Sequence, residues 1–147
     1  MKRIILSLSL MLAVGLTTVL ANYETPVNDR VKESFKNEFP GVESVKWSDQ
    51  GDYQKATFVF TGHRSVAYFN TDGELEGSAR DLFFDQLPLA VMRSFDKRFA
   101  GADFIDVLEV TNIEGTSYHL TLEVQNKRYR VKADAGGTIL GVVKVKK

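Results

Sequence analysis

The stretch SVAYFNTDGELEG (residues 65–77) can be laid over the stretch YRVKADAGGTILG (residues 129–141) without a gap. Gly73 then falls on Gly137, 64 positions later, and the apolar positions on either side of both glycines stay in step. Asp-Gly and Gly-Gly pairs suit the positive φ values that tight turns between paired strands require. Each stretch is therefore predicted to be a β-hairpin, and the chain contains the same unit twice.

A helical pattern precedes each copy of this unit. The apolar residues recur every four positions, at Val27, Val31, Phe35 and Phe39 and again 60 positions later at Leu87, Val91, Phe95 and Phe99. Such a stripe is typical of one side of an amphipathic helix. Thr25 is predicted to cap the first helix and Asp85 or Gln86 the second. The helices are expected to end at Pro40 and at Gly101.

Between each helix and its hairpin the apolar period changes to two, which indicates strands with one apolar face. Ala56, Phe58 and Phe60 show this alternation, and Leu120, Leu122 and Val124 repeat it 64 positions later. Val45 and Trp47 correspond to Ile105 and Val107 at the shorter offset of 60, so the second half is expected to have the longer first hairpin. The predicted strands are residues 43–48, 53–61, 64–70 and 74–80 in the first half and 103–111, 116–125, 128–134 and 138–145 in the second.

The predicted fold follows from this repeat. Each half, about residues 25–80 and 86–145, is a helix followed by four antiparallel strands, and one half alone buries its apolar face poorly. Two halves side by side form an eight-stranded antiparallel sheet with two helices on one face, which is an α+β fold. Trp47, the only tryptophan, is expected to be largely buried beneath the first helix.

The N-terminus has the pattern of a secretory signal peptide. MKR supplies positive charge, an uncharged apolar run follows, and Val19 and Ala21 are the small residues that a signal peptidase reads. Cleavage after Ala21 would leave one domain, residues 22–147, in the periplasm or outside the cell with no membrane span. A retained membrane anchor is the alternative.

Composition narrows the function classes. Without Lys2 and Arg3, 17 of the 19 basic residues remain against 19 acidic ones, so no nucleic-acid partner is expected. The chain has no cysteine, so its stability does not rest on disulfides.

No reaction centre is recognisable either. His63 and His119 are the only histidines and lie in no nucleophile motif, so no catalytic role is expected for them and the protein is not predicted to be an enzyme. Asn70, Asp72 and Glu74 alternate as in a calcium loop but lack the distant bidentate glutamate. We predict no cofactor and leave a calcium site at the Asp72-Gly73 turn open.

The predicted outward positions of the strands are the candidate partner surface, because tyrosine and arginine are common at interface hot spots. An ordinary solvated sheet face is the alternative. The candidate residues are Tyr53, Lys55, Val59, Arg64, Val66, Tyr68, His119 and Arg130 on the face, with Asp49 and Asp52 in the SDQGD loop.

Taken together, the apolar leader, the segment FPGVESVKW, the Asp-Gly turn and the later LP-containing helix resemble the PepSY-like family of β-lactamase-inhibitor-like proteins, exported chiefly by Bacteroidetes-type bacteria. The resemblance covers nearly all of residues 22–147. It implies the tandem helix-plus-four-strand architecture of β-lactamase inhibitor proteins, whose concave sheet clasps an enzyme. Those inhibitors carry disulfides, which this chain lacks, and no stretch here aligns with their inhibitory loop.

The function expected from this resemblance and from the candidate face is that of an exported, non-enzymatic module. It would bind a protein or peptide of the cell envelope, and in the narrowest form of the hypothesis it would inhibit an envelope enzyme. The alternative is a structural or envelope-stress component without a specific partner. The sequence predicts neither the partner's identity nor the oligomeric state.

Overall fold

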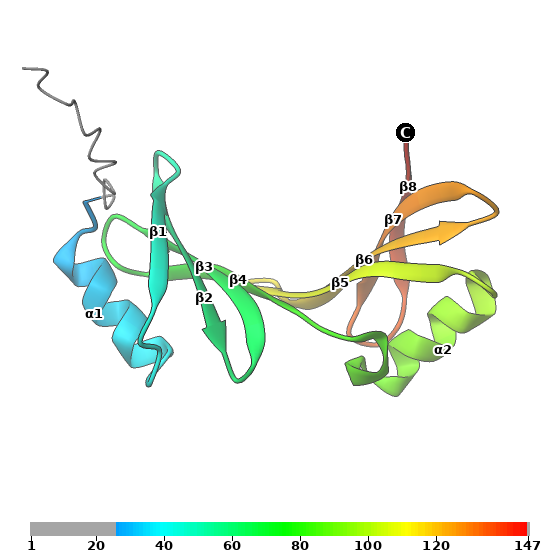
Figure 1. Ribbon diagram of the computed structural model, residues 1–147, viewed down its shortest axis with the longest axis horizontal. Helices are drawn as coiled ribbons and strands as arrows, with labels where there is room; N and C mark the ends of the chain where they lie inside the picture. Colours follow the sequence, from blue (N-terminus) through cyan, green and yellow to red (C-terminus); the bar gives the residue numbers. More distant parts are fainter. Residues whose placement is uncertain (1–25, 147) are drawn as a thin grey trace, which may run out of the picture.

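The computed structural model describes residues 26–146, which form one eight-stranded antiparallel sheet with two helices (Figure 1). The predicted signal peptide and Thr25 lie outside the described residues. The elements are α1 (Asp29–Glu38), β1 (Val45–Asp49), β2 (Tyr53–Phe60), β3 (His63–Asn70), β4 (Leu75–Asp81), the 3-10 helix η1 (Phe84–Gln86), α2 (Leu89–Arg98), β5 (Asp103–Asn112), β6 (Gly115–Val124), β7 (Lys127–Asp134) and β8 (Ile139–Val145).

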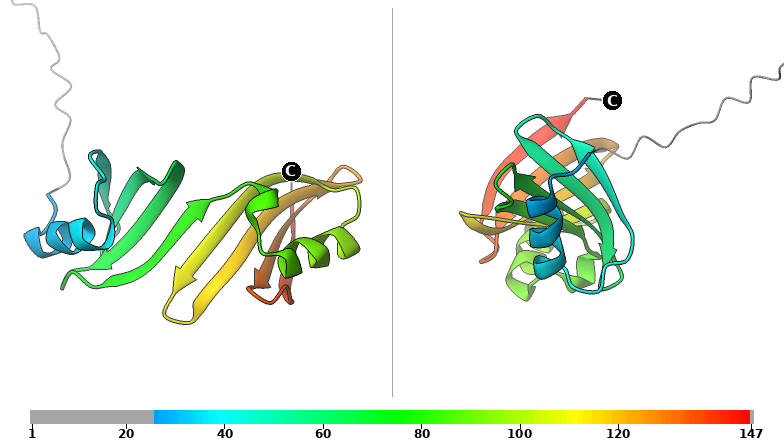
Figure 2. Two further views of the ribbon diagram at one scale, coloured as in Figure 1. Left: turned by 90° about the horizontal axis from the view of Figure 1, so that it is seen from below. Right: turned by 90° about the vertical axis from the view of Figure 1, so that its left-hand side faces the viewer.

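The strands follow one another across the sheet in sequence order, from β1 at one edge to β8 at the other. The sheet is strongly twisted, so that the strands change direction between its two edges and its middle in Figure 1. Both helices lie on the same side of the sheet, one near each end, as Figure 2 shows from below. The predicted α+β architecture is confirmed, and each predicted strand is found with bounds that differ by at most two residues.

The core consists of two clusters, one beneath each helix. In the first, Val31 and Phe35 of α1 pack on Ala56, Phe58 and Phe69 of the sheet. The second repeats this arrangement between α2 and the later strands, with Val91, Phe95, Leu120, Leu122 and Val131 buried. The apolar stripes that the sequence repeats at offsets of 60 and 64 are therefore the facing surfaces of the two cores.

The turn glycines of the repeat lie directly against the helices. Gly73 and Gly137 both have φ of +88°, and both are buried. A Cβ atom on Gly73 would be 3.1 Å from the carbonyl oxygen of Arg30 in α1. On Gly137 it would overlap the carbonyl oxygen of Ala90 in α2 and come within 2.9 Å of Ser94 Oγ. Each hairpin turn therefore requires glycine for its conformation and also for its contact with the helix.

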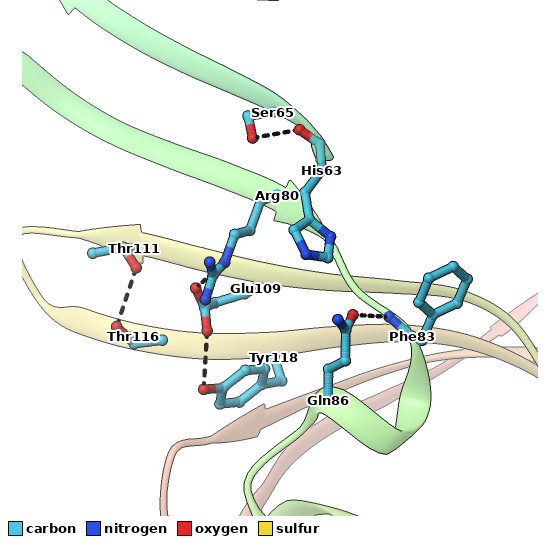
Figure 3. A network of polar contacts seen from close by, with 9 residues as sticks. All are labelled: His63, Ser65, Arg80, Phe83, Gln86, Glu109, Thr111, Thr116 and Tyr118. Atoms are coloured by element: carbon cyan, nitrogen blue, oxygen red, sulfur yellow. Dashed lines mark hydrogen bonds and ion pairs between the residues drawn. The ribbon is translucent and has the colours of Figure 1, made fainter. Parts of the chain in front are cut away.

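A polar seam on the helix side joins the two halves between the cores (Figure 3). Arg80 of β4 pairs with Glu109 of β5, with 2.7 Å between Nε and Oε1, and Tyr118 of β6 donates a hydrogen bond to the other carboxylate oxygen at 3.2 Å. Burial, and then the carboxylate of Glu109, raises the pKa of the Tyr118 phenol. The β4–β5 junction is thus held by an ion pair and backbone pairing, while apolar packing dominates on either side of it.

The predicted helix caps are wrong. Asn28 caps α1, because its Oδ1 accepts a hydrogen bond from the backbone N–H of Arg30 at 2.9 Å while its Nδ2 donates to the carbonyl of Thr71 at 2.9 Å. Pro88 occupies the N-cap position of α2 without a side-chain hydrogen bond. Gln86 instead closes η1 by accepting a hydrogen bond from the N–H of Phe83.

Two predicted core positions also need correction. Trp47 is only partly buried, because β1 is the edge strand and no further strand covers its outer side; its ring still lies edge-on to Phe35 at 5.3 Å between ring centres. Ile105 is 51% exposed, because a β-bulge between Phe104 and Asp106 shifts the alternation. Phe104 takes the inward place and stacks on Phe84 at 4.0 Å between ring centres.

The helix–turn contact predicts a graded response to alanine. Gly137→Ala should lower the free energy of unfolding by about 2–4 kcal/mol, because it combines a positive φ with overlap of helix backbone. Gly73→Ala should cost less, since its nearest contact is looser. Gly136→Ala is the matched control, because its φ is not in the left-handed region and only Asp134 Oδ1 is near, at 3.3 Å. Urea unfolding of the three variants measures the order, and equal losses at Gly136 and Gly137 would contradict the contact.

Candidate binding face

The face of the sheet opposite the helices carries a continuous row of side chains across seven strands. We call it the central row, and its neighbours are paired strand by strand: Lys46, Thr57, Val66, Ala79, Val110, Ser117 and Asp134. The middle of the row is small and apolar, and Val66, Ala79 and Val110 are partly buried although no helix covers them. Because Ala79 and Val110 sit on β4 and β5, this apolar middle lies where the two halves meet.

Aromatic and basic residues border the central row in the first half. Tyr68 of β3 lies opposite Gly77 of β4, which has no side chain, and the ammonium of Lys55 lies 5.8 Å from the centre of the Tyr68 ring. Tyr53, at the start of β2, is 42% exposed. These side chains come from adjacent strands and share the open face, as the alternation in the sequence predicts.

A shallow depression of about 410 Å³ lies on the same face near the end of β2. Its outward-facing lining is Lys46, Thr57, Val59 and Arg64. Arg64 is bound to Asp81 of β4, with distances of 2.7 Å from Nε to Oδ2 and 3.3 Å from Nη2 to Oδ1. This carboxylate raises the pKa of the guanidinium, first through the hydrogen bond and then through its charge. A ligand would therefore meet Arg64 as half of an ion pair.

The second half contributes histidine and cations. His119 of β6 lies between Leu108 of β5 and Lys132 of β7, and its Nε2 is 3.2 Å from the hydroxyl of Ser117. Burial lowers the pKa of His119 from its ordinary value of 6.5, and the charge of Lys132 lowers it further. Arg130 projects from the next row, opposite Thr121 and Val143.

The structure does not gather all the predicted candidates into one site. The first-half residues Tyr53, Lys55, Val59, Arg64, Val66 and Tyr68 form one patch, which β4 and β5 separate from His119 and Arg130. Asp49 accepts a hydrogen bond from the N–H of Gly51 at 2.8 Å and so closes its own turn, while Asp52 is exposed beside it. Both lie at the β1–β2 turn.

Sequence reasoning missed two features of this surface. Ala79 and Val110 are neighbours because β4 pairs with β5, and the sequence pattern did not predict this pairing, although both residues fall on the outward side of predicted strands. Ile113 is 90% exposed at the tip of the longer β5–β6 hairpin. The four-residue difference between the halves pointed to this hairpin, but nothing in the sequence marked its tip as apolar and exposed.

The side chain of Asn70 stabilises the Asp72-Gly73 turn through hydrogen bonds. The Oδ1 of Asn70 accepts hydrogen bonds from the N–H groups of Asp72 and Glu74, and its Nδ2 donates to the carboxylates of Glu74 and Glu76. Within residues 26–146, no three His, Cys, Asp or Glu side chains are grouped so that they could hold a metal ion. No helix in this part of the chain is long and apolar enough to span a membrane.

Comparisons with known proteins identify the fold. No protein-family model matches this sequence, and no curated protein matches it. Among solved structures, a BLIP-like protein from Bacteroides fragilis is 22% identical, with a TM-score of 0.75 over 83% of this chain and 89% of its own. A predicted periplasmic protein from Bacteroides eggerthii (22% identity, TM-score 0.75, 81% of this chain and 89% of its own) is similar to the same extent.

A DUF2874 family protein from Bacteroides ovatus has the same fold as well, at 22% identity and a TM-score of 0.74, covering 81% of this chain and 88% of its own. Identity of this order shows the fold alone. The chain therefore has the BLIP-like fold, and its resemblance to the PepSY-like family stays a prediction.

The lowered pKa of His119 makes stability depend on pH in a defined direction. The unfolded chain binds the proton more tightly than the folded protein, so this contribution to stability is complete above pH 6.5 and is lost as the pH falls below it. Urea unfolding at about pH 8 and about pH 5 should show a smaller acid loss in His119→Gln than in the wild type. Lys132→Gln should reduce the loss in part. An unchanged pH dependence in His119→Gln would contradict the assignment.

Proposed function

We propose that this protein is an exported binding module that holds a protein or peptide on the open face of its sheet and performs no chemistry of its own. The observation that supports this most is the composition of the central row. An antiparallel sheet with one solvated face normally alternates apolar inward and polar outward residues. Here the outward middle of the sheet is apolar instead, at Val66, Ala79 and Val110.

The surroundings of the central row indicate the chemistry of the partner. Lys55, Arg130 and Lys132 take part in none of the ion pairs found within residues 26–146, whereas Arg64 is already paired with Asp81. A segment with apolar side chains for the middle of the row and acidic groups for these cations matches the face best. Tyr53 and Tyr68 are of the residue type that most often contributes binding energy at protein interfaces.

Export and inhibition are two further parts of the proposal. The leader pattern of residues 1–21 supports export, and one protein of the same fold is a predicted periplasmic protein. Another is a BLIP-like protein, and the sequence resembles a family of β-lactamase-inhibitor-like proteins. Inhibition of an envelope enzyme is therefore the narrow form of the proposal, in which the β1–β2 turn with Asp49 and Asp52 would reach the enzyme.

Site-specific photocrosslinking in cells tests which face meets the partner. A photoreactive phenylalanine replaces Tyr68 on the open face or, as the control, Lys32 on α1, whose side chain is 50% exposed. A specific adduct at position 68 and none at position 32 is expected. Adducts at position 32 alone would place the partner on the helices and contradict the proposal.

The crosslinked partner then allows a quantitative prediction. Tyr68→Ala and Tyr53→Ala should each weaken its binding by about 2 kcal/mol, roughly 30-fold in Kd, because each removes a large side chain from the contact. Their free energy of unfolding should change by no more than about 1 kcal/mol, because neither side chain belongs to a core cluster. Arg130→Ala should weaken binding more at low than at high salt. Unchanged affinity in all three variants would contradict the proposal, because the partner would then contact the loops or the helices.

Export has its own test. Mass spectrometry of the protein from the periplasmic or secreted fraction should give a chain that begins at Asn22. A chain that keeps Met1 and stays in the membrane fraction would show that residues 1–21 form an anchor.

A further inference from the structure

The two edges of the sheet differ in how well they are protected. Exposed edge strands pair readily with other chains, and proteins usually protect them with short length, charge, proline or a bulge. The edge strand β1 has five residues, including Lys46 and Asp49. β8 has seven residues and only one charge, Lys144, and its bulge, between Ile139 and Gly141, lies at the start of the strand. Three of its apolar side chains are exposed: Leu140 at 56%, Val142 at 37% and Val143 at 64%.

No helix covers the second core where it reaches the edge strand β8. Val131 and Ala133 of β7 are buried in the cluster beneath α2. Val142 lies opposite Val131 on the same face, yet it is more than one-third exposed. The apolar surface therefore continues one strand beyond the helix that covers it, and an added strand would extend this core in register.

We propose that the added strand is β8 of a second copy of this chain, paired antiparallel about a two-fold axis at Val142. In such a pairing Val142 lies opposite Val142 of the second copy, and Val143 lies opposite Gly141. Lys144 falls beside Leu140, the residue at the bulge of β8, so no lysine faces a lysine. A parallel pairing in register would bring the two Lys144 side chains together instead, which costs energy.

The charge of the whole molecule is compatible with this dimer. Without Lys2 and Arg3 the chain has 17 basic and 19 acidic residues, so its formal net charge is only −2 and the repulsion between two copies is weak. The contact between the two β8 strands is short, so we expect a weak dimer, with a Kd between about 1 μM and about 1 mM. Because the axis is perpendicular to the sheet, the open faces of the two copies lie side by side and form one continuous surface. The dimer does not depend on the proposed function of that surface.

Sedimentation velocity tests the contact between the two β8 strands. The protein used is the chain that begins at Asn22, which contains every described residue. The wild type should pass from monomer to dimer below about 1 mM. Val142→Lys and Val142→Glu should each raise the Kd of the dimer at least about tenfold, because each sets two like charges opposite one another. An equal mixture of the two variants should form a heterodimer again, which a folding defect could not do.

Val59→Lys is the matched control, since Val59 is 63% exposed on an inner strand and should leave the dimer unchanged. A wild type that stays monomeric at about 1 mM overturns the proposal. A dimer that survives both Val142 variants, or one that Val59→Lys abolishes, overturns it too, because the contact would then lie elsewhere.

Discussion

The close approach between each helix and its hairpin turn is the contact on which the arrangement of this molecule depends. Gly137 lies so close to the carbonyl of Ala90 that a Cβ atom would overlap it, and Gly73 lies close to the carbonyl of Arg30 in a looser contact. This contact holds the helix over one face of the strands that precede and follow the turn. Its position leaves the opposite face open, and the repetition of the contact puts both helices on the same side. The positions of Gly73 and Gly137 therefore determine which face of the sheet the helices leave open.

The join between the halves explains why the open face has an apolar middle. On the helix side, the space between the two cores is occupied by the ion pair of Arg80 and Glu109 and by the hydroxyl of Tyr118. The same strands, β4 and β5, present Ala79 and Val110 on the other side. The usual distribution of polar and apolar groups between the two faces is thus reversed at the junction.

Much of the fold could be predicted from the sequence because each apolar pattern occurs twice. The offsets of 60 and 64 located the helices, the strands and the two faces, and the register of Ala56, Phe58 and Phe60 agrees with the prediction. The predictions that were wrong concern features that depend on long-range pairing or on local irregularities of the strands. The bulge at Phe104 shifts Ile105 outward without any change in composition, and the exposure of Trp47 depends on β1 being an edge. Pairs such as Arg64 with Asp81 join positions 17 apart through the sheet and leave no local signal.

Hydroxyl-radical footprinting of the purified protein tests the assignment of the two faces most directly, because it reports the solvent access of single side chains. The account predicts rapid modification of Tyr53 on the open face. Phe58, which alternates with the open-face positions of the same strand, and Phe95 beneath α2 should be protected, since they are 4% and 0% exposed. Modification of Phe58 and Phe95 as fast as that of Tyr53 would contradict it, because the helices would then not cover the face on which the two cores are built.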